Sequence, residues 1–144
     1  MSGVLFAASM PAQAPISAAT AAGETERFDA IACLDERARR RATPARPVAP
    51  GRYIEVQGPQ ETLLILLAQG VTHVGRGLAA DLRLDDDSVS RRHALLLNRS
   101  SGVRVLDDRS SNGTFVNGRR IFEADLCDGD VLVLGRIVLR YLDV

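Results

Sequence analysis

The sequence predicts an all-β sandwich from residue 51 onward, preceded by an N-terminal tail. From that point short apolar or alternating runs recur every few residues, as strands do, and Gly, Asn or Asp turn signals separate them. No long helical pattern interrupts the runs, and residues 51–144 are close in length to the roughly 100 residues of a compact sandwich. With 144 residues, of which 46% are hydrophobic and 25% charged, the chain can bury one core.

The predicted tail, residues 1–50, has three parts. Residues 1–23 carry no charged side chain, lack the positively charged start of a secretory signal, and contain no apolar run long enough to span a membrane. In residues 26–41 apolar side chains recur every three positions, so we expect a short amphipathic helix there. Residues 42–50 contain three prolines and are interpreted as a linker. The tail is therefore expected to be largely disordered or partly helical.

The expected strands follow one another at short intervals after the linker. They cover residues 53–56, 62–67, 71–74, 82–84, 94–97, 103–106, 114–116, 119–121, 131–134 and 137–141. Asn117-Gly118 is the strongest hairpin signal, because both central residues of such a two-residue turn need positive φ. Asp128-Gly129 and Gly135-Arg136 predict further turns.

Charge and cysteine content narrow the function classes. The formal net charge is +0, so no overall field draws the chain to nucleic acid or to a membrane surface. Cys33 and Cys127 lie in different contexts, which is typical of free thiols in a reducing compartment such as the cytoplasm. Because no Cys/His cluster is present, we expect neither a bound metal nor a cofactor. All 18 basic residues are arginines, the better bidentate partners for phosphate and carboxylate.

Three separate loops of the predicted sandwich carry hydrogen-bond donors. Their candidate binding residues are Arg76, Ser90, Arg91, Ser111 and Asn112. None of them is a general base at neutral pH, and guanidinium, hydroxyl and amide groups are all donors. Donors that converge from several loops suit an anion with several acceptor oxygens, and phosphate is the common one. The pattern therefore indicates reversible anion binding without catalysis.

Four motifs carry a resemblance to a known family. They are Gly75-Arg76, residues 90–93 (SRRH), residues 110–114 (SSNGT) and Asn117-Gly118, in this order and with apolar strands between them. Across about residues 51–143 this arrangement resembles the forkhead-associated (FHA) domains. The resemblance implies a β-sandwich of about eleven strands in two sheets, which binds phosphothreonine in partner proteins through loops at one end.

The resemblance also implies a role for each matching residue. Arg76 and Ser90 would hold the phosphate, and Ser111 would add a hydroxyl. Asn112 would hydrogen-bond the peptide backbone, and Arg91 would touch phosphate or peptide.

Other matching residues are implied to act on specificity or on loop structure. Ser88 would lie near the peptide residue three beyond the phosphothreonine, and is the candidate for residue preference at that position. The residues implied to hold loops in place, without touching ligand, are Gly75, His93, Gly113, Thr114, Asn117 and Gly118. His93 and Ser90 do not form a recognisable catalytic pair, because neither a nucleophile elbow nor an orienting acid accompanies them.

Residues 85–87, three consecutive aspartates, admit a different interpretation from the donor loops. They lack the spacing and the terminal glutamate of a calcium loop, so a solvated acidic loop that favours basic peptides is expected. Arg92 is expected to be solvated or paired with one of these aspartates. Cys127 is interpreted as a small packed residue.

Thr25 lies in an acid-flanked stretch, Gly-Glu-Thr-Glu-Arg-Phe. Some short bacterial FHA proteins carry an N-terminal threonine that a Ser/Thr kinase phosphorylates and that the domain then binds in cis, and this segment is similar in layout. Residues 27–50 are long enough to span a small domain. Thr25 is therefore a phosphorylation candidate whose phosphorylated tail would bind intramolecularly, and an ordinary polar tail is the alternative.

Two function classes remain open from the sequence. The first is a non-catalytic phosphothreonine-binding adaptor or regulator in bacterial Ser/Thr kinase signalling, whose partner is a phosphothreonine-containing protein or the kinase. The second is a phosphate-independent scaffold that uses the same loops or the tail. An enzyme is not supported, and neither nucleic acid nor a membrane span is expected. The cluster of Arg37, Arg39, Arg40 and Arg41 is weak evidence for contact with nucleic acid or an acidic partner.

Overall fold

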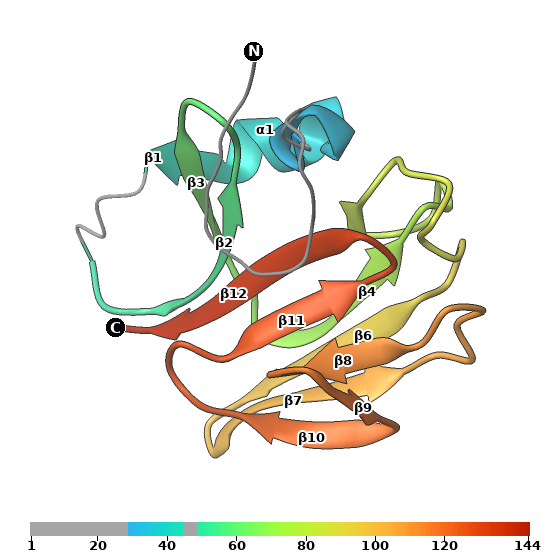
Figure 1. Ribbon diagram of the computed structural model, residues 1–144. Helices are drawn as coiled ribbons and strands as arrows, with labels where there is room; N and C mark the ends of the chain where they lie inside the picture. The colour runs from blue at the N-terminus through green and yellow to red at the C-terminus, as the bar shows by residue number, and fades with distance from the viewer. Residues whose placement is uncertain (1–28, 45–48) are drawn as a thin grey trace, which may run out of the picture.

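Two β-sheets packed against each other form the body of the molecule (Figure 1). The computed structural model describes residues 29–44 and 49–144. One sheet has seven strands in the order β1-β3-β2-β12-β11-β8-β9, and the other has five in the order β10-β7-β6-β4-β5. The strands are β1 (Ala42–Pro44), β2 (Arg52–Gln57), β3 (Thr62–Leu66), β4 (Gly70–Gly75), β5 (Leu82–Arg83), β6 (Ala94–Arg99), β7 (Gly102–Asp107), β8 (Thr114–Val116), β9 (Arg119–Ile121), β10 (Glu123–Leu126), β11 (Val131–Leu134) and β12 (Ile137–Asp143).

The predicted all-β sandwich is confirmed. Each strand expected from the sequence overlaps an observed one, and paired strands are antiparallel except β4 and β5, which are parallel. The predicted hairpin at Asn117-Gly118 joins β8 to β9, with φ of 51° and 82° at its two central residues. Both values lie in the left-handed region, which Asn and Gly tolerate best.

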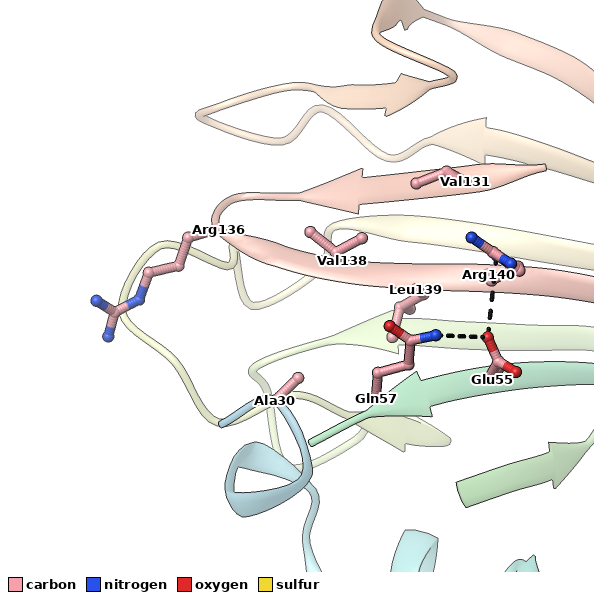
Figure 2. Close-up of a pocket in the computed structure, with 8 residues that line it drawn as sticks. All are labelled: Ala30, Glu55, Gln57, Val131, Arg136, Val138, Leu139 and Arg140. Atoms are coloured by element: carbon pink, nitrogen blue, oxygen red, sulfur yellow. Dashed lines mark hydrogen bonds and ion pairs between the residues drawn. The ribbon is translucent and has the colours of Figure 1, made fainter. Parts of the chain in front are cut away.

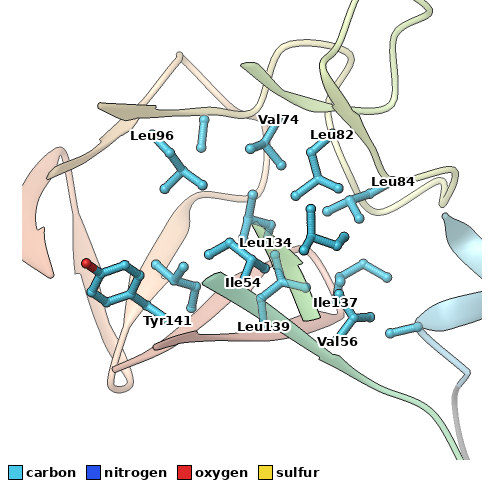
Figure 3. Packing of buried hydrophobic residues seen from close by; sticks show 14 of the residues in the cluster. Ile54, Val56, Val74, Leu82, Leu84, Leu96, Leu134, Ile137, Leu139 and Tyr141 are labelled. Carbon is cyan, nitrogen blue, oxygen red and sulfur yellow. The ribbon is translucent and has the colours of Figure 1, made fainter. Parts of the chain in front are cut away.

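The core lies between the two sheets. Along β12 the residues Ile137, Leu139 and Tyr141 are buried, while the residues between them face outward. This alternation follows from the two-residue period of a strand, so one face of each sheet is apolar. Figure 3 shows the side chains of β12 and β2 meeting those of β4, β5 and β6 in the middle of the sandwich, with Ile54 and Leu96 among them.

Strand β10 was not predicted, because its sequence has no strong strand former before its last residue. It pairs with β7, and Arg104 of β7 forms ion pairs with Glu123 at 2.6 Å and with Asp125 at 2.9 Å. On the opposite face Leu126 is buried. Cross-strand pairs of opposite charge stabilise such a strand, and they cannot be read from the strand's own sequence.

Residues 29–44 differ from the predicted tail and are called the N-terminal clip here. The expected helix over residues 26–41 is two shorter pieces, the 3₁₀ helix η1 (Ile31–Cys33) and α1 (Glu36–Arg41), and residues 26–28 lie outside the described part. The expected linker over residues 42–50 begins as a strand, because β1 pairs with the edge of β3. An edge position tolerates the proline at its end.

The clip attaches to both sheets. Strand β1 extends the seven-stranded sheet, and Leu34 forms a β-bridge with Leu84, just after β5 of the other sheet. The backbone N–H of Asp85 donates to the carbonyl of Cys33 at 2.7 Å, and Arg37 Nη2 donates to the carbonyl of Ala80 at 2.5 Å. The clip also contributes buried apolar side chains to the core. Residues 29–44 therefore belong to the packed unit together with the sandwich that was predicted from residue 51 onward.

Side-chain hydrogen bonds within the clip stabilise its two short helices. The side chain of Asp35 caps α1 by accepting from the N–H of Ala38 at 2.9 Å. Arg39 donates to the carbonyls of Leu34 and Ile31, so this arginine holds the clip together. In the described part of the chain no helix is long and apolar enough to cross a membrane.

Candidate functional site

The loops that carry hydrogen-bond donors together line one hollow of about 550 Å³. It is formed by the residue after β4, the loop between β5 and β6, and the loop between β7 and β8. Its lining residues are Arg76, Ser90, Arg91, Arg92, Asp108, Arg109 and Ser111. Three residues predicted to bind phosphate, Arg76, Ser90 and Ser111, therefore face the same space although up to 35 positions separate them in the sequence.

Backbone contacts hold Arg76 against the β5–β6 loop. Its N–H donates to the carbonyl of Ser90 at 2.9 Å, and its Nε donates to the carbonyl of Val89 at 3.0 Å. A Cβ on Gly75 would lie 2.2 Å from the carbonyl oxygen of Arg91, so the two chains approach too closely for any side chain there. Among the described residues the two Nη groups of Arg76 have no hydrogen-bond partner, and they remain as donors toward the hollow.

His93 connects the β5–β6 loop to the β7–β8 loop through its buried side chain. The side chain is fully buried, its Nδ1 accepts from the N–H of Ser90 at 3.1 Å, and its Nε2 donates to the carbonyl of Gly113 at 2.9 Å. This pattern requires the neutral imidazole with the proton on Nε2, because a carbonyl only accepts. Burial lowers the pKa of His93, although the Gly113 carbonyl and the charge of Asp107 act in the opposite direction. The imidazole contacts the backbone of Ser90 and not its hydroxyl.

Ser90 and Ser111 lie side by side at the edge of the hollow. The N–H of Ser111 donates to Ser90 Oγ at 2.8 Å. A serine hydroxyl has one proton to donate, and no described residue accepts it from Ser90. The site therefore presents a hydroxyl donor beside the guanidinium of Arg76.

Asp107 organises the β7–β8 loop, and the sequence analysis missed it. Its carboxylate accepts from Ser110 Oγ at 2.5 Å and from Thr114 Oγ1 at 2.7 Å. Ser110 Oγ in turn accepts from the N–H of Gly113 at 2.9 Å. Burial alone would raise the pKa of Asp107, but the hydroxyl hydrogen bonds from Ser110 and Thr114 lower it on balance. An aspartate three residues before a serine is a local turn pattern that could have signalled this role.

Asn112 and Ser88 close the other end of the site. Asn112 Nδ2 donates to the carbonyl of Ser88 at 2.9 Å. The hydroxyl of Ser88 donates to Asp86 at 2.5 Å and accepts from the N–H of Arg136 at 2.9 Å. The structure therefore brings Ser88 next to Asn112, but both hydrogen-bonding roles of the Ser88 hydroxyl are taken within the protein.

The expectation of a solvated acidic loop over residues 85–87 is wrong for Asp86. The side chain is only 6% exposed and forms an ion pair with Arg136 at 2.7 Å. Burial raises the pKa of this carboxyl, but hydrogen bonds from Arg136 and Ser88 outweigh burial and lower it overall. Asp86 is a structural anion that ties the loop to the β11–β12 turn, 50 positions along the chain.

Two further expectations are corrected. Arg92 is 80% exposed, in line with the solvated alternative, but the carboxylate with which it pairs, at 3.0 Å, is Asp108 and not one of residues 85–87. Cys127 is exposed and not packed, because strand β10 turns Leu126 inward and the next residue outward. Cys33, in the clip, is the buried thiol, and burial raises its pKa.

The sequence analysis did not single out two of the lining residues, Asp108 and Arg109. Arg109 also has an unusual backbone conformation. Its φ is +58°, a left-handed conformation uncommon for a residue other than Gly, Asn or Asp. It stands directly before the predicted motif 110–114, and that adjacency was the available signal.

A second hollow, of about 220 Å³, lies on the outer face of the seven-stranded sheet (Figure 2). Glu55, Gln57 and Arg140 lie along it, with Gln57 donating to Glu55 at 3.2 Å and Arg140 3.9 Å from Glu55. The negative charge of Glu55 in this groove disfavours the binding of an anionic ligand. The loop-built hollow is therefore the better candidate for phosphate.

Known proteins point to one family. The profile of the FHA domain matches residues 72–135. The oxoglutarate dehydrogenase inhibitor of Corynebacterium diphtheriae is 33% identical over 97 residues, which cover 67% of this chain and 68% of that protein. The chain belongs to the FHA domain family. The resemblance inferred from the four sequence motifs is thereby confirmed at the level of the family.

Other FHA proteins are similar over the same region. The glycogen accumulation regulator GarA of Mycobacterium tuberculosis is 38% identical over 95 residues, which cover 65% of this chain. The chain spans 59% of the length of GarA, less than two thirds. An FHA domain solved in a structural and functional analysis of phosphothreonine-dependent FHA domain interactions has 32% sequence identity and a TM-score of 0.59, and the match covers 63% of this chain and 94% of that domain.

Proposed function

We propose that this chain is a non-catalytic phosphothreonine-binding protein that acts as an adaptor or regulator in bacterial Ser/Thr kinase signalling. The observation that carries the proposal is the convergence of Arg76, Ser90 and Ser111 on one hollow. These groups are donors, and a phosphate dianion offers three strong acceptor oxygens. The partner is a phosphothreonine-containing protein, either the kinase or one of its substrates.

Each residue has a distinct part in the proposed complex. Arg76 and Ser90 hold the phosphate, and Ser111 adds its hydroxyl. Arg91 contacts the phosphate or the peptide, and Asn112 exchanges its bond to the Ser88 carbonyl for one to the peptide backbone. A charge-assisted hydrogen bond contributes about 1.5–3 kcal/mol, so a few of them give reversible binding.

Similarity to characterised relatives supports a regulatory role. Two of the relatives are described as a glycogen accumulation regulator and as an oxoglutarate dehydrogenase inhibitor. A similar domain was solved in work on phosphothreonine-dependent interactions. We place this chain in the cytoplasm, where its two free thiols would stay reduced.

A pair of matched peptides tests the proposal. The same threonine-containing sequence, with and without phosphate, is titrated into the wild-type chain and into R76A and R119A. The proposal expects binding only of the phosphorylated peptide, with affinity at least about tenfold weaker for R76A. Arg119 is an exposed arginine after the turn at the far end of β8 from the site, so R119A should bind as the wild type does. Equal binding of both peptides would favour the phosphate-independent scaffold instead.

We further propose that phosphorylation of Thr25 regulates the protein by occupying its own site. Thr25 lies outside the described residues, but Asp29, four positions later, begins the clip. Four residues span at most about 14 Å, so the segment that links Thr25 to the clip reaches a shorter distance than a free segment of residues 27–50 would. Ala30 and Arg136 line the same outer hollow, and the backbone N–H of Arg136 donates to Ser88 Oγ, so the clip and the Ser88 end of the site share a neighbour in Arg136.

Self-regulation is tested with a Ser/Thr kinase and the variant T25A. The wild-type chain should gain phosphate at Thr25 and lose binding of the phosphothreonine peptide, whereas T25A should keep it. Sizing the phosphorylated chain distinguishes binding within one molecule from binding between two. Phosphorylated Thr25 without loss of peptide binding would reject this mode of regulation.

A further inference from the structure

The loop-built hollow carries more positive charge than one phosphate requires. Arg76, Arg91, Arg92 and Arg109 line it together with one aspartate, Asp108, which leaves a net charge of +3 on the lining. A phosphothreonine carries about −1.5 to −2 at pH 7. Positive charge therefore remains after one phosphate has bound.

Among these lining residues, Arg91 and Arg109 supply the uncompensated charge. Arg92 is paired with Asp108 at 3.0 Å. Arg91 and Arg109 are exposed, and neither side chain has a hydrogen bond or ion pair with any residue in the described ranges. Arginines without carboxylate partners beside an anion site are available to a ligand.

The backbone at Arg109 supports the same conclusion. Its φ of +58° is a conformation that Asn or Gly would adopt with less strain. Non-glycine residues in such conformations cluster at active sites and ligand-binding sites. No described residue accepts a hydrogen bond from this side chain, so a contact within the described fold does not explain an arginine here.

At the other end of the site the polar side chains are paired within the protein. There Asn112 is bonded to Ser88, and Arg136 is paired with the buried Asp86. None of these four residues lines the hollow, whereas Ser90, Ser111 and Arg109 do. The spare positive charge therefore belongs to the hollow itself and not to the end of the site at Asn112 and Ser88.

We propose that the hollow binds a second anionic group on the same peptide, held by Arg109 together with Arg91. The ligand is a phosphothreonine peptide that carries another phosphate or a carboxylate within about three residues, since an extended segment of that length spans about 10 Å. This inference rests on the proposed function, because the first phosphate is the one held by Arg76. A preference for acidic peptides would be the opposite of the preference for basic peptides that was expected from residues 85–87.

The test uses one peptide sequence in several forms. These carry phosphothreonine alone, phosphothreonine with a second phosphothreonine two residues before or after it, and phosphothreonine with Glu at either of those positions. They are titrated into the wild-type chain, R109N and R119N. Asn tolerates a positive φ, so R109N removes the charge without adding backbone strain, and R119N is the matched loss of an exposed arginine outside the hollow.

The expected result is position-dependent and charge-dependent. At one of the two positions the second phosphate should tighten wild-type binding about tenfold, with Glu giving a smaller gain. R109N should abolish that gain while binding the singly phosphorylated peptide within about threefold of wild type, and R119N should keep the gain. The gain should also shrink as salt concentration rises, because the arginines are exposed.

Two results would overturn the inference, and they differ from a failure of the proposed function. The inference is rejected if neither doubly charged peptide binds more tightly than the single one, or if R109N weakens all forms equally. If no phosphorylated form binds the wild-type chain, the proposed function itself fails and this inference fails with it.

Discussion

His93 Nε2 lies 2.9 Å from the carbonyl oxygen of Gly113, and the opposite ring nitrogen accepts from the N–H of Ser90. One buried neutral imidazole thus connects two loops of the candidate site. Protonation of Nδ1 would remove the acceptor for Ser90 and place a charge in the core. We therefore expect acid to loosen the two loops that the imidazole connects.

Acidification should lower stability through His93. Burial lowers its pKa in the folded state below the ordinary 6.5, so the unfolded chain binds the extra proton first. The free energy of unfolding should be constant above about pH 6.5 and fall as pH drops through the window between the unfolded and folded pKa values. Urea unfolding across this range checks it, and H93Q should show a flatter dependence. Equal slopes for the two proteins would contradict this role of the imidazole.

Replacing Asp86 with Asn should loosen the loop that carries Ser88. The carboxylate receives hydrogen bonds from Arg136 at 2.7 Å and from Ser88 at 2.5 Å. Loss of such charge-assisted bonds at a buried group should cost about 1.5–3 kcal/mol of unfolding free energy and weaken peptide binding. D87N, at an exposed neighbour, is the control and should change neither quantity. Equal effects of D86N and D87N would show that the loop does not depend on this ion pair.

Gly135 should tolerate alanine less well than Gly129. Both have positive φ, 62° and 89°, so both variants share the backbone strain of about 1–2 kcal/mol. At Gly135 a Cβ would also lie 2.3 Å from the carbonyl oxygen of Ser88, whereas at Gly129 it meets open space. G135A should therefore lose more unfolding free energy than G129A and should alone weaken peptide binding. Urea denaturation and peptide titration of the pair measure both effects.

The N-terminal clip should be necessary for stability. Leu34 is 4% exposed, packs in the core and bridges to Leu84. L34A should cost about 2–5 kcal/mol of unfolding free energy, and removal of residues 1–50 should cost more than removal of residues 1–28. R41A, at an exposed position in α1, should stay within about 0.5 kcal/mol of wild type. Equal stability of the two truncated chains would place the clip outside the cooperative unit.

Strands and turns were predictable because their signals are local. The alternation along β12 and the Asn117-Gly118 turn each depend on a few neighbouring residues. The donor residues of the site were likewise found from their types and their motif order. Four of the five, Arg76, Ser90, Arg91 and Ser111, do line one hollow.

The features that were missed depend on contacts between distant segments. Asp86 was expected to be solvated because its charge partner, Arg136, is 50 positions away in the sequence. The clip was read as tail and linker because its stability comes from packing on β3 and on the residues around Leu84, not from helix propensity. Arg109 was missed because a backbone conformation cannot be read from its residue type.

A structure of this chain bound to a phosphothreonine peptide tests the central claim most directly. The account predicts phosphate oxygens within about 3 Å of the Arg76 guanidinium and of the hydroxyls of Ser90 and Ser111, with Asn112 bonded to the peptide backbone. A phosphate bound elsewhere, for example along the outer groove of Glu55 and Arg140, would contradict it.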